Sequence, residues 1–290
     1  NNNLLFRHAF AKKGRTISVN LTAGFNHKDG YSYLHSITDN YKFIVISDTV
    51  NQYTDQLVNG FNYGANLSYT EPIGKKGQLQ FSYSPSVTKN KSDQEVFEYD
   101  ASSGKYSMLD TSYSNKFDNT ITTHTVNTSY RVGDRDNMFN VGLSYKYTEL
   151  GSKQVYPAIG SVNVNFNNVL PNLMWRKKIS TKSSINVMYR ANTNTPSISQ
   201  LQNVYNNSNP LQQSVGNPDL KQQVTNMLST RYSYTNSQKS TSFFANLFLQ
   251  QADNYITTAT YKPAADSLLS NGKILRQGAQ LSRPVNMDGY

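Results

Sequence analysis

The stretch that decides the fold is Phe139-Asn140-Val141-Gly142-Leu143-Ser144-Tyr145-Lys146-Tyr147. Apolar or aromatic side chains occupy every second position, and Asn, Gly, Ser and Lys stand between them. Because successive side chains of a β-strand point to opposite faces, this alternation predicts a strand with one apolar and one polar face. The same period of two recurs along the chain, in residues 17–25, 61–69, 79–83, 185–189, 228–234 and 243–249. No helical pattern of useful length is present, so the chain is predicted to be all-β.

The connections between these predicted strands alternate between short and long. Short turns are predicted at 12–14, 72–77, 133–137, 177–182 and 236–239. Long connections are predicted at 27–56, 91–119, 151–161, 191–223 and from 257 onward. Strands joined in this way form hairpins. The sequence therefore predicts an antiparallel up-and-down sheet of about ten to eleven strands, with short turns on one side and long loops on the other.

The polar face of each strand distinguishes a soluble sandwich from a membrane barrel, because a barrel meets lipid with its apolar face and water with its polar face. The predicted polar-face positions are Asn62, Asn66, Ser68, Asn140, Ser144, Lys146, Asn186, Ser229, Arg231 and Ser233. Aromatic residues recur near strand ends, as in interfacial girdles, at Tyr69, Tyr83, Tyr130, Tyr147, Trp175, Tyr189 and Tyr234. Strand lengths of roughly 9–11 residues suit a tilted membrane strand. These features favour a transmembrane β-barrel over a secreted soluble β-sandwich or solenoid.

The charge of the chain lies mostly between the strands. Its 290 residues carry 28 Lys and Arg against 18 Asp and Glu, a net charge of +10. Basic residues gather in the short turns, at Lys12, Lys13, Arg15, Lys75, Lys76, Arg176, Lys177, Lys178, Lys182 and Lys239. A nucleic-acid interface interleaves its cations with exposed aromatics, and this chain separates the two. We therefore expect no nucleic acid partner, and lipid headgroups beside the turns.

Motifs of catalysis and metal binding are missing from the sequence. There is no cysteine, no nucleophile elbow, no phosphate-binding glycine loop and no close histidine pair. Acidic residues gather in one predicted loop, at Asp93, Glu95, Glu98, Asp100 and Asp110. This group offers oxygen ligands for a cation such as Ca²⁺ but lacks a defined spacing, so solvated loop charge is the preferred interpretation. We expect no enzyme activity, no cofactor and no bound metal.

Two stretches resemble a known family. The first, 4–18, is similar to a periplasmic hairpin of outer-membrane β-barrel proteins related to TonB-dependent receptors. In the second, 170–221, a strand ending in Tyr-Arg leads into a T-x-x-P-S-x-x-Q-L-like loop, and G-N-P-x-L-K opens the next strand. The matching positions are Tyr189, Arg190, Pro196, Ser197, Gln200, Leu201, Gly216, Asn217, Pro218, Leu220 and Lys221.

The resemblance implies a barrel of about 22 strands with an N-terminal plug and an energy-coupling box. Residues 1–290 are then expected to be one partial outer-membrane β-barrel domain, without the plug and the N-terminal domains. The implied location is the outer membrane. The implied function is import of a nutrient or metal chelate through a plug-gated lumen, powered by an inner-membrane complex. A barrel for adhesion or surface display, without transport, is the alternative.

The family motif is expected to be structural. Pro196 and Pro218 suit places where the strand ladder stops and restarts. Gly216 and Asn217 suit a turn that needs positive φ. The amide-rich loop 202–213, with Tyr205, offers hydrogen-bonding groups to a ligand, and the sequence singles out no contact residue within it. The terminal segment 282–290 is expected to lead into a further strand of the sheet.

Overall fold

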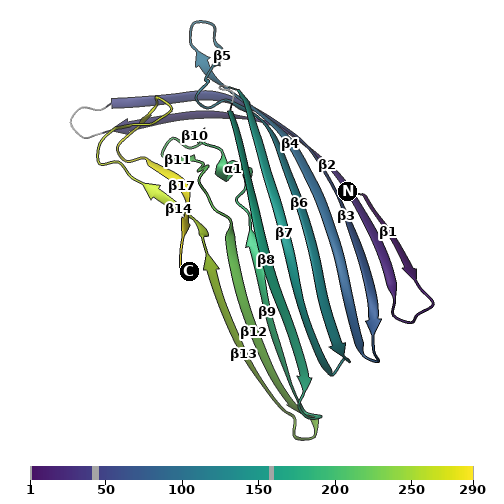
Figure 1. The fold of residues 1–290 in the computed structure, drawn as a ribbon. Helices are drawn as coiled ribbons and strands as arrows, with labels where there is room; N and C mark the ends of the chain where they lie inside the picture. Colours follow the sequence, from purple (N-terminus) through teal and green to yellow (C-terminus); the bar gives the residue numbers. More distant parts are fainter. Residues whose placement is uncertain (1, 41–45, 157–159, 290) are drawn as a thin grey trace.

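The computed structural model describes residues 2–40, 46–156 and 160–289. Most of them belong to one long, curved sheet, called the wall below (Figure 1). Its strands are β1 (Asn2–Ala9), β2 (Thr16–Asn40), β3 (Ile46–Ile73), β4 (Gly77–Asp100), β5 (Lys105–Leu109), β6 (Asn115–Gly133), β7 (Asn137–Tyr156), β8 (Gly160–Lys178), β9 (Ser183–Asn194), β12 (Gln223–Asn236) and β13 (Thr241–Asp253).

The wall is an 11-stranded antiparallel sheet. Its order is β1-β2-β3-β4-β6-β7-β8-β9-β12-β13, with the short β5 paired to β4. Apart from β5, wall strands that follow one another along the chain are thus neighbours in space, which is the up-and-down topology predicted from the hairpin pattern. Among the described residues β1 and β13 each pair on one side only, so the sheet is not closed. The predicted fold class is confirmed.

All five short turns lie at one end of the wall, called the turn end (Figure 1). Glycines with positive φ stand in three of them: Gly14 at 88°, Gly74 at 62° and Gly133 at 110°. Only glycine adopts this conformation without a steric penalty, which explains the glycine at these positions. The opposite end is called the loop end.

Three of the predicted long loops are wrong. β2 and β3 stay paired from Thr16↔Thr70 as far as Asn40↔Ile46, so most of 27–56 is strand. Much of 91–119 and of 151–161 likewise belongs to β4, β5, β6, β7 and β8. Residues 41–45 and 157–159 lie outside the described residues. The prediction failed here because both faces of these extensions are largely polar, so they lack the contrast that reveals a half-buried strand.

The outward face of the wall carries an apolar band. Register places Phe139, Val141, Leu143, Tyr145 and Tyr147 on the same face as the apolar residues of the neighbouring strands. These side chains are not covered by the protein; Leu143, at the middle of β7's run, is 53% exposed. The nine-residue run of β7 matches what a tilted strand needs to cross a bilayer. Among the described residues no second layer covers this apolar face, as a sandwich would require, so the arrangement favours the membrane barrel.

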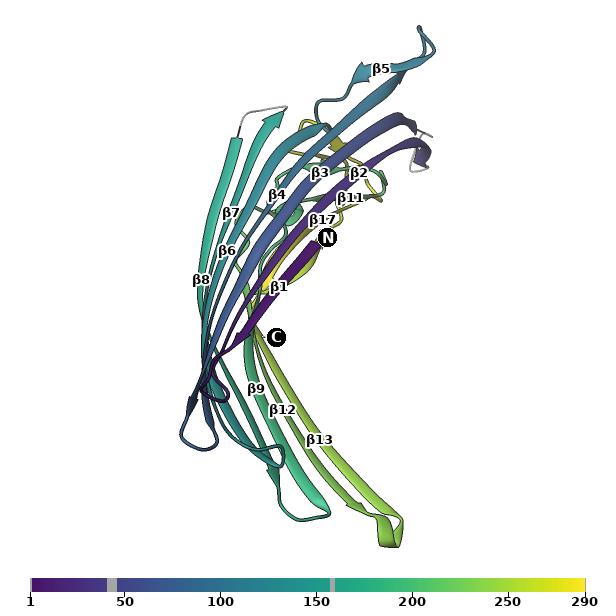
Figure 2. The same cartoon turned by 90° about the vertical axis from the view of Figure 1, so that its right-hand side faces the viewer.

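The polar face is concave and holds a smaller unit, called the inner lobe, made of residues 195–222 and 254–289 (Figure 2). Its elements are α1 (Ile198–Leu201), β10 (Tyr205–Asn206), β11 (Gln212–Val215), β14 (Tyr255–Tyr261), β15 (Ser267–Leu268), β16 (Ile274–Leu275) and β17 (Gln280–Met287). Among the described residues, no helix is long and apolar enough to cross a membrane.

Four strands of the inner lobe form a separate sheet in the order β10-β11-β17-β14. Within it β11 and β17 are parallel, with Gln212 opposite Gln280 and Ser214 opposite Ser282. The segment 282–290 was expected to lead into the next wall strand. That expectation is wrong, because most of the segment is β17 of the inner lobe; Tyr290 itself lies outside the described residues.

Two apolar clusters fasten the inner lobe to the wall. In the first, the buried Leu150 of β7 packs with Leu201 and Leu220 of the lobe. In the second, Val96 of β4 packs with Tyr205 and Val215. Leu150 and Val96 have the register of the polar face, so each is an apolar side chain in a polar row. Burying these side chains fixes the position of the lobe on the wall.

Candidate functional site

The family motif lies where the inner lobe packs against the wall. Pro196 is fully buried where β9 has ended, and Ser197 caps the single turn α1. The Ser197 hydroxyl accepts a hydrogen bond from the backbone N–H of Gln200. In return, the side-chain oxygen of Gln200 accepts a hydrogen bond from the backbone N–H of Ser197. This reciprocal capping box holds the turn in place, and so directs Leu201 at the wall.

The expected role of Gly216 in a positive-φ turn is wrong. Neither Gly216 nor Asn217 has a positive φ. Instead, a Cβ on Gly216 would lie 2.0 Å from the Gln202 carbonyl oxygen. The adjoining Asn217 amide donates to the Gln200 carbonyl oxygen at 2.6 Å. Glycine is required because two backbone segments touch, not because the chain turns sharply.

Two motif residues, Asn217 and Lys221, join the two halves of the lobe. The Asn217 side chain donates to the Pro284 carbonyl at 2.9 Å and accepts from Arg283 at 2.9 Å. The Lys221 amide donates to the Asn286 side chain at 2.7 Å. Tyr189 lies in the wall, where its hydroxyl donates to Asn226 at 2.9 Å, and Arg190 has the register of the polar face.

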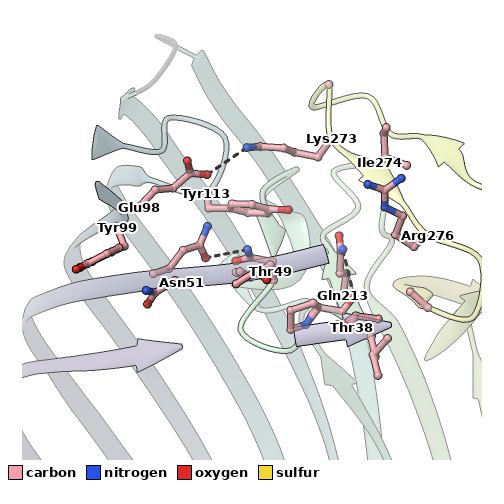
Figure 3. A pocket seen from close by; sticks show the side chains of 17 residues that line it. Thr38, Thr49, Asn51, Glu98, Tyr99, Tyr113, Gln213, Lys273, Ile274 and Arg276 are labelled. Atoms are coloured by element: carbon pink, nitrogen blue, oxygen red, sulfur yellow. Dashed lines mark hydrogen bonds and ion pairs between the residues drawn. The ribbon is translucent and has the colours of Figure 1, made fainter. Parts of the chain in front are cut away.

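A cavity of about 600 Å³ lies at the loop end, between the wall and the inner lobe (Figure 3). The wall contributes the far ends of β2, β3 and β4, including Asn51, Gln52 and Glu98. The lobe contributes two segments, 207–213 and 272–279, including Gln213 and Lys273. None of the motif residues lines this cavity, so the motif supports the site without forming it.

The charges of this cavity are paired inside the protein. The Lys273 ammonium lies 3.1 Å from Asp110 and 3.7 Å from Glu98 (Figure 3), and 5.6 Å from the centre of the Tyr113 ring. Burial, with the nearby Asp110 and Glu98 carboxylates, raises the pKa of Tyr113 to about 12. The phenol therefore stays protonated at neutral pH. A ligand entering the cavity meets dipoles and aromatic rings rather than unpaired charge.

Amide side chains supply the polar lining. Asn207 donates to the buried Gln52 side chain at 3.0 Å, which joins the lobe to β3. Gln213 donates to the Pro210 carbonyl at 3.4 Å, and its own side-chain oxygen is buried with no hydrogen-bond partner among the described residues. A buried, unpaired acceptor costs free energy, and a ligand hydroxyl or amide would satisfy it.

The amide-rich loop 202–213 does contribute to the cavity, through Asn207 and Gln213. Tyr205 does not line it, because its ring is buried in the second apolar cluster. Apart from Glu98, which the sequence placed in an acidic group, the wall residues and Lys273 were missed by sequence reasoning. No local signal marks them, since the cavity joins segments that lie far apart in the chain.

The acidic group weighed as a cation site does not form one cluster, and four of its five members pair with a lysine. Asp93 and Glu95 both pair with Lys116, at 2.9 and 2.7 Å. Asp100 accepts from Ser102 in a turn, while Glu98 and Asp110 meet Lys273 as described above. Among the described residues, no group of three or more His, Asp or Glu is arranged to hold a metal ion.

Comparison with known families identifies the family of the chain. Residues 8–287 match the model of the outer membrane protein β-barrel family. The chain belongs to this family. Its location is accordingly the outer membrane, where the apolar band of the wall meets lipid. No curated protein matches the sequence.

Solved structures that match the chain include a hemophore receptor and two siderophore receptors. HasR of Serratia marcescens, a hemophore receptor double mutant bound to its hemophore HasA and heme, matches 94% of this chain and 50% of its own, with 12% identity and a TM-score of 0.52. The ferric enterobactin receptor PfeA of Pseudomonas aeruginosa (8% identity) matches 99% and 57%, and the siderophore receptor PirA of the same organism (8% identity) matches 99% and 60%. Their TM-scores are 0.35 and 0.33.

The HasR match supports the barrel fold alone. This chain spans half the length of HasR and less than two thirds of PfeA and PirA. The family and the fold thus establish an outer-membrane β-barrel.

Proposed function

We propose that this chain is part of an outer-membrane receptor that captures a small solute at the loop end and imports it through the lumen. The observation that carries the proposal is the cavity of about 600 Å³ between the wall and the inner lobe. Its volume falls in the range typical of small-molecule sites. Its lining combines Tyr113 with hydrogen-bonding amides, and it lies on the concave, wet side of a membrane wall.

In this proposal the chain binds and conducts, with no covalent chemistry. A plug-type domain would gate the lumen from the turn end, and an inner-membrane complex would supply the energy. Both belong to parts of the receptor beyond these strands, as the resemblance of the motif implies.

The test uses the full-length gene in its own host. Cells are fed a mixed nutrient extract, and the solutes they accumulate are measured by mass spectrometry. We compare wild type, a gene deletion, and a cavity double variant, Gln213→Ala with Tyr113→Ala. A proton ionophore is added to a fourth culture of wild-type cells. At least one solute should be lost in the deletion and after ionophore, and reduced in the cavity variant. Equal accumulation of every solute in all four cultures would reject import.

A display or adhesion barrel is the second candidate, favoured by one observation. Beyond the apolar band, the outward faces of β2 and β3 carry an aromatic group in which Tyr31 is 73% and Tyr33 62% exposed. Exposed aromatic groups of this kind mark contact surfaces. Loss of surface adhesion in the deletion strain, with unchanged solute uptake, would support this candidate instead.

A further inference from the structure

The two faces of the wall differ in their balance of charges: the outward face of the segments below carries both Lys89 and Lys177 and two acidic residues, and the polar face carries no acidic residue. The segments at the level of the apolar band are 2–9, 16–27, 59–72, 77–90, 119–133, 137–149, 166–177, 183–192, 224–236 and 241–251. Within these described segments the polar face carries six basic residues: Arg7, Arg131, Lys146, Arg176, Arg190 and Arg231. The acidic residues of the same segments are Glu71 and Glu149, and both have outward register. Within these segments, the lumen side of the wall thus carries basic charges only.

These cations are not neutralised within the described chain. None of the six forms an ion pair with a described acidic residue. Lys146 donates to the Thr193 hydroxyl at 3.3 Å, and Arg231 lies 5.6 Å from the centre of the Phe244 ring. This contrasts with the loop-end cavity, where Lys273 is held by two carboxylates.

Three arginines line one hollow near the turn end. Arg131 of β6, Arg176 of β8 and Arg135 of the turn between β6 and β7 border a concavity of about 430 Å³ on the polar face. Polar neighbours such as Gln80 and Asn140 complete its lining. Guanidinium groups bind carboxylate and phosphate oxygens in pairs, with a geometry that lysine does not match. A hollow edged by three of them suits an anion with several such groups.

We propose that the lumen wall selects anionic solutes, and that Arg131, Arg135 and Arg176 form an anion-binding station near the turn end. A passage lined by one sign of charge with low-dielectric walls concentrates counter-ions and speeds their entry. Rings of Arg and Lys give the same selectivity in anion pores. The ligand class is a small solute that bears two or more carboxylate or phosphate groups. This inference rests on the proposed import function and adds the substrate class.

The test measures anion binding by the purified full-length protein in detergent, with citrate as the anionic probe and xylitol as the neutral one. Titration calorimetry should detect citrate and not xylitol. Neutralising the station in Arg131→Gln with Arg176→Gln should weaken citrate binding roughly tenfold or more. Raising KCl from about 50 to 300 mM should also weaken wild-type binding, because salt screens exposed charges.

The matched control removes two charges from the other face of the same wall. Lys89 and Lys153 are exposed, have outward register and form no ion pair with a described residue. Lys89→Gln with Lys153→Gln should change citrate affinity less than about twofold. Heat-modified migration on gels checks that each variant is folded. If the double arginine variant does not fold, Arg135→Gln alone replaces it, because Arg135 lies in an exposed turn.

Three results would overturn the proposal: equal weakening by the inward and outward pairs, equal binding of citrate and xylitol, or no citrate binding by the wild-type full-length protein. The last would show that another part of the receptor covers the arginines. Binding in detergent does not depend on uptake by cells. Citrate binding without any solute import would reject the proposed function alone, and import without citrate binding would reject the anion station alone.

Discussion

Gly216 shows how much one residue can decide in this molecule. Two backbone segments of the inner lobe touch at this position, and the Asn217 amide bonds to the Gln200 carbonyl across the contact. The contact holds α1, and α1 carries the Leu201 side chain that reaches the wall. A motif that looks like a turn in the sequence is therefore a point of close packing.

Gly216→Ala is expected to loosen the inner lobe. The new Cβ would lie 2.0 Å from the Gln202 oxygen and 2.9 Å from the Gln200 oxygen, so the two segments must separate. Overpacking of this kind costs about 1–3 kcal/mol. Hydrogen exchange of residues 195–222 in the full-length protein should accelerate. Gly30→Ala is the control, because a Cβ there meets nothing within 4 Å. Equal exchange in both variants would contradict the close-contact explanation.

The inner lobe is the element that separates this molecule from a plain hairpin wall. It is formed from a connection and from the residues after β13, and it fills part of the concave side (Figure 2). Its seat consists of Leu150 in the wall with Leu201 and Leu220 in the lobe, which are 2%, 3% and 3% exposed. The same lobe supplies Lys273 and Gln213 to the cavity. The cavity is therefore complete only when the lobe is packed against the wall.

Leu201→Ala should release the lobe while leaving the wall folded. Truncating a buried leucine costs about 2–5 kcal/mol, because the lost contacts leave a cavity. Limited proteolysis should then cut within 202–222 faster than in wild type. Leu143→Ala is the matched control, since that leucine faces outward at 53% exposure and touches no part of the lobe cluster. A protease pattern identical to that of wild type would show that the lobe is held elsewhere.

The whole molecule is a sheet whose two faces meet different solvents, lipid on the outward face and water on the inward face. Its outward face is apolar over the height of a bilayer, and its inward face is polar with six cations. The low charged fraction of 16% and the many tyrosines fit such a wall, since only one face and the two ends meet water. A net charge of +10 that first suggests nucleic acid is explained by basic turns and a cationic lumen face.

A pair of neighbouring substitutions tests this division of faces. Leu143→Arg places a charge at the middle of the apolar band, where it should cost about 2–4 kcal/mol. Ser144→Arg, one residue later, places the same charge on the inward face and should cost much less. Urea unfolding of the full-length protein in lipid vesicles gives both values. A larger loss for Ser144→Arg would mean that the faces are assigned the wrong way round.

The sequence by itself determined the strands within the membrane, the face of each residue, the turn end and the family. A period of two and turn glycines are local signals, and they specify faces and turns without reference to distant residues. Only the tertiary structure decided the long strand extensions, the parallel pairing of β11 with β17, the seat of the lobe and the loop-end cavity. Lys273 meets Asp110 across 163 residues of chain, and Arg131 of β6 and Arg176 of β8 border one hollow although β7 lies between their strands. Such contacts depend on how separate segments pack, and the local alternation of the sequence does not encode that packing.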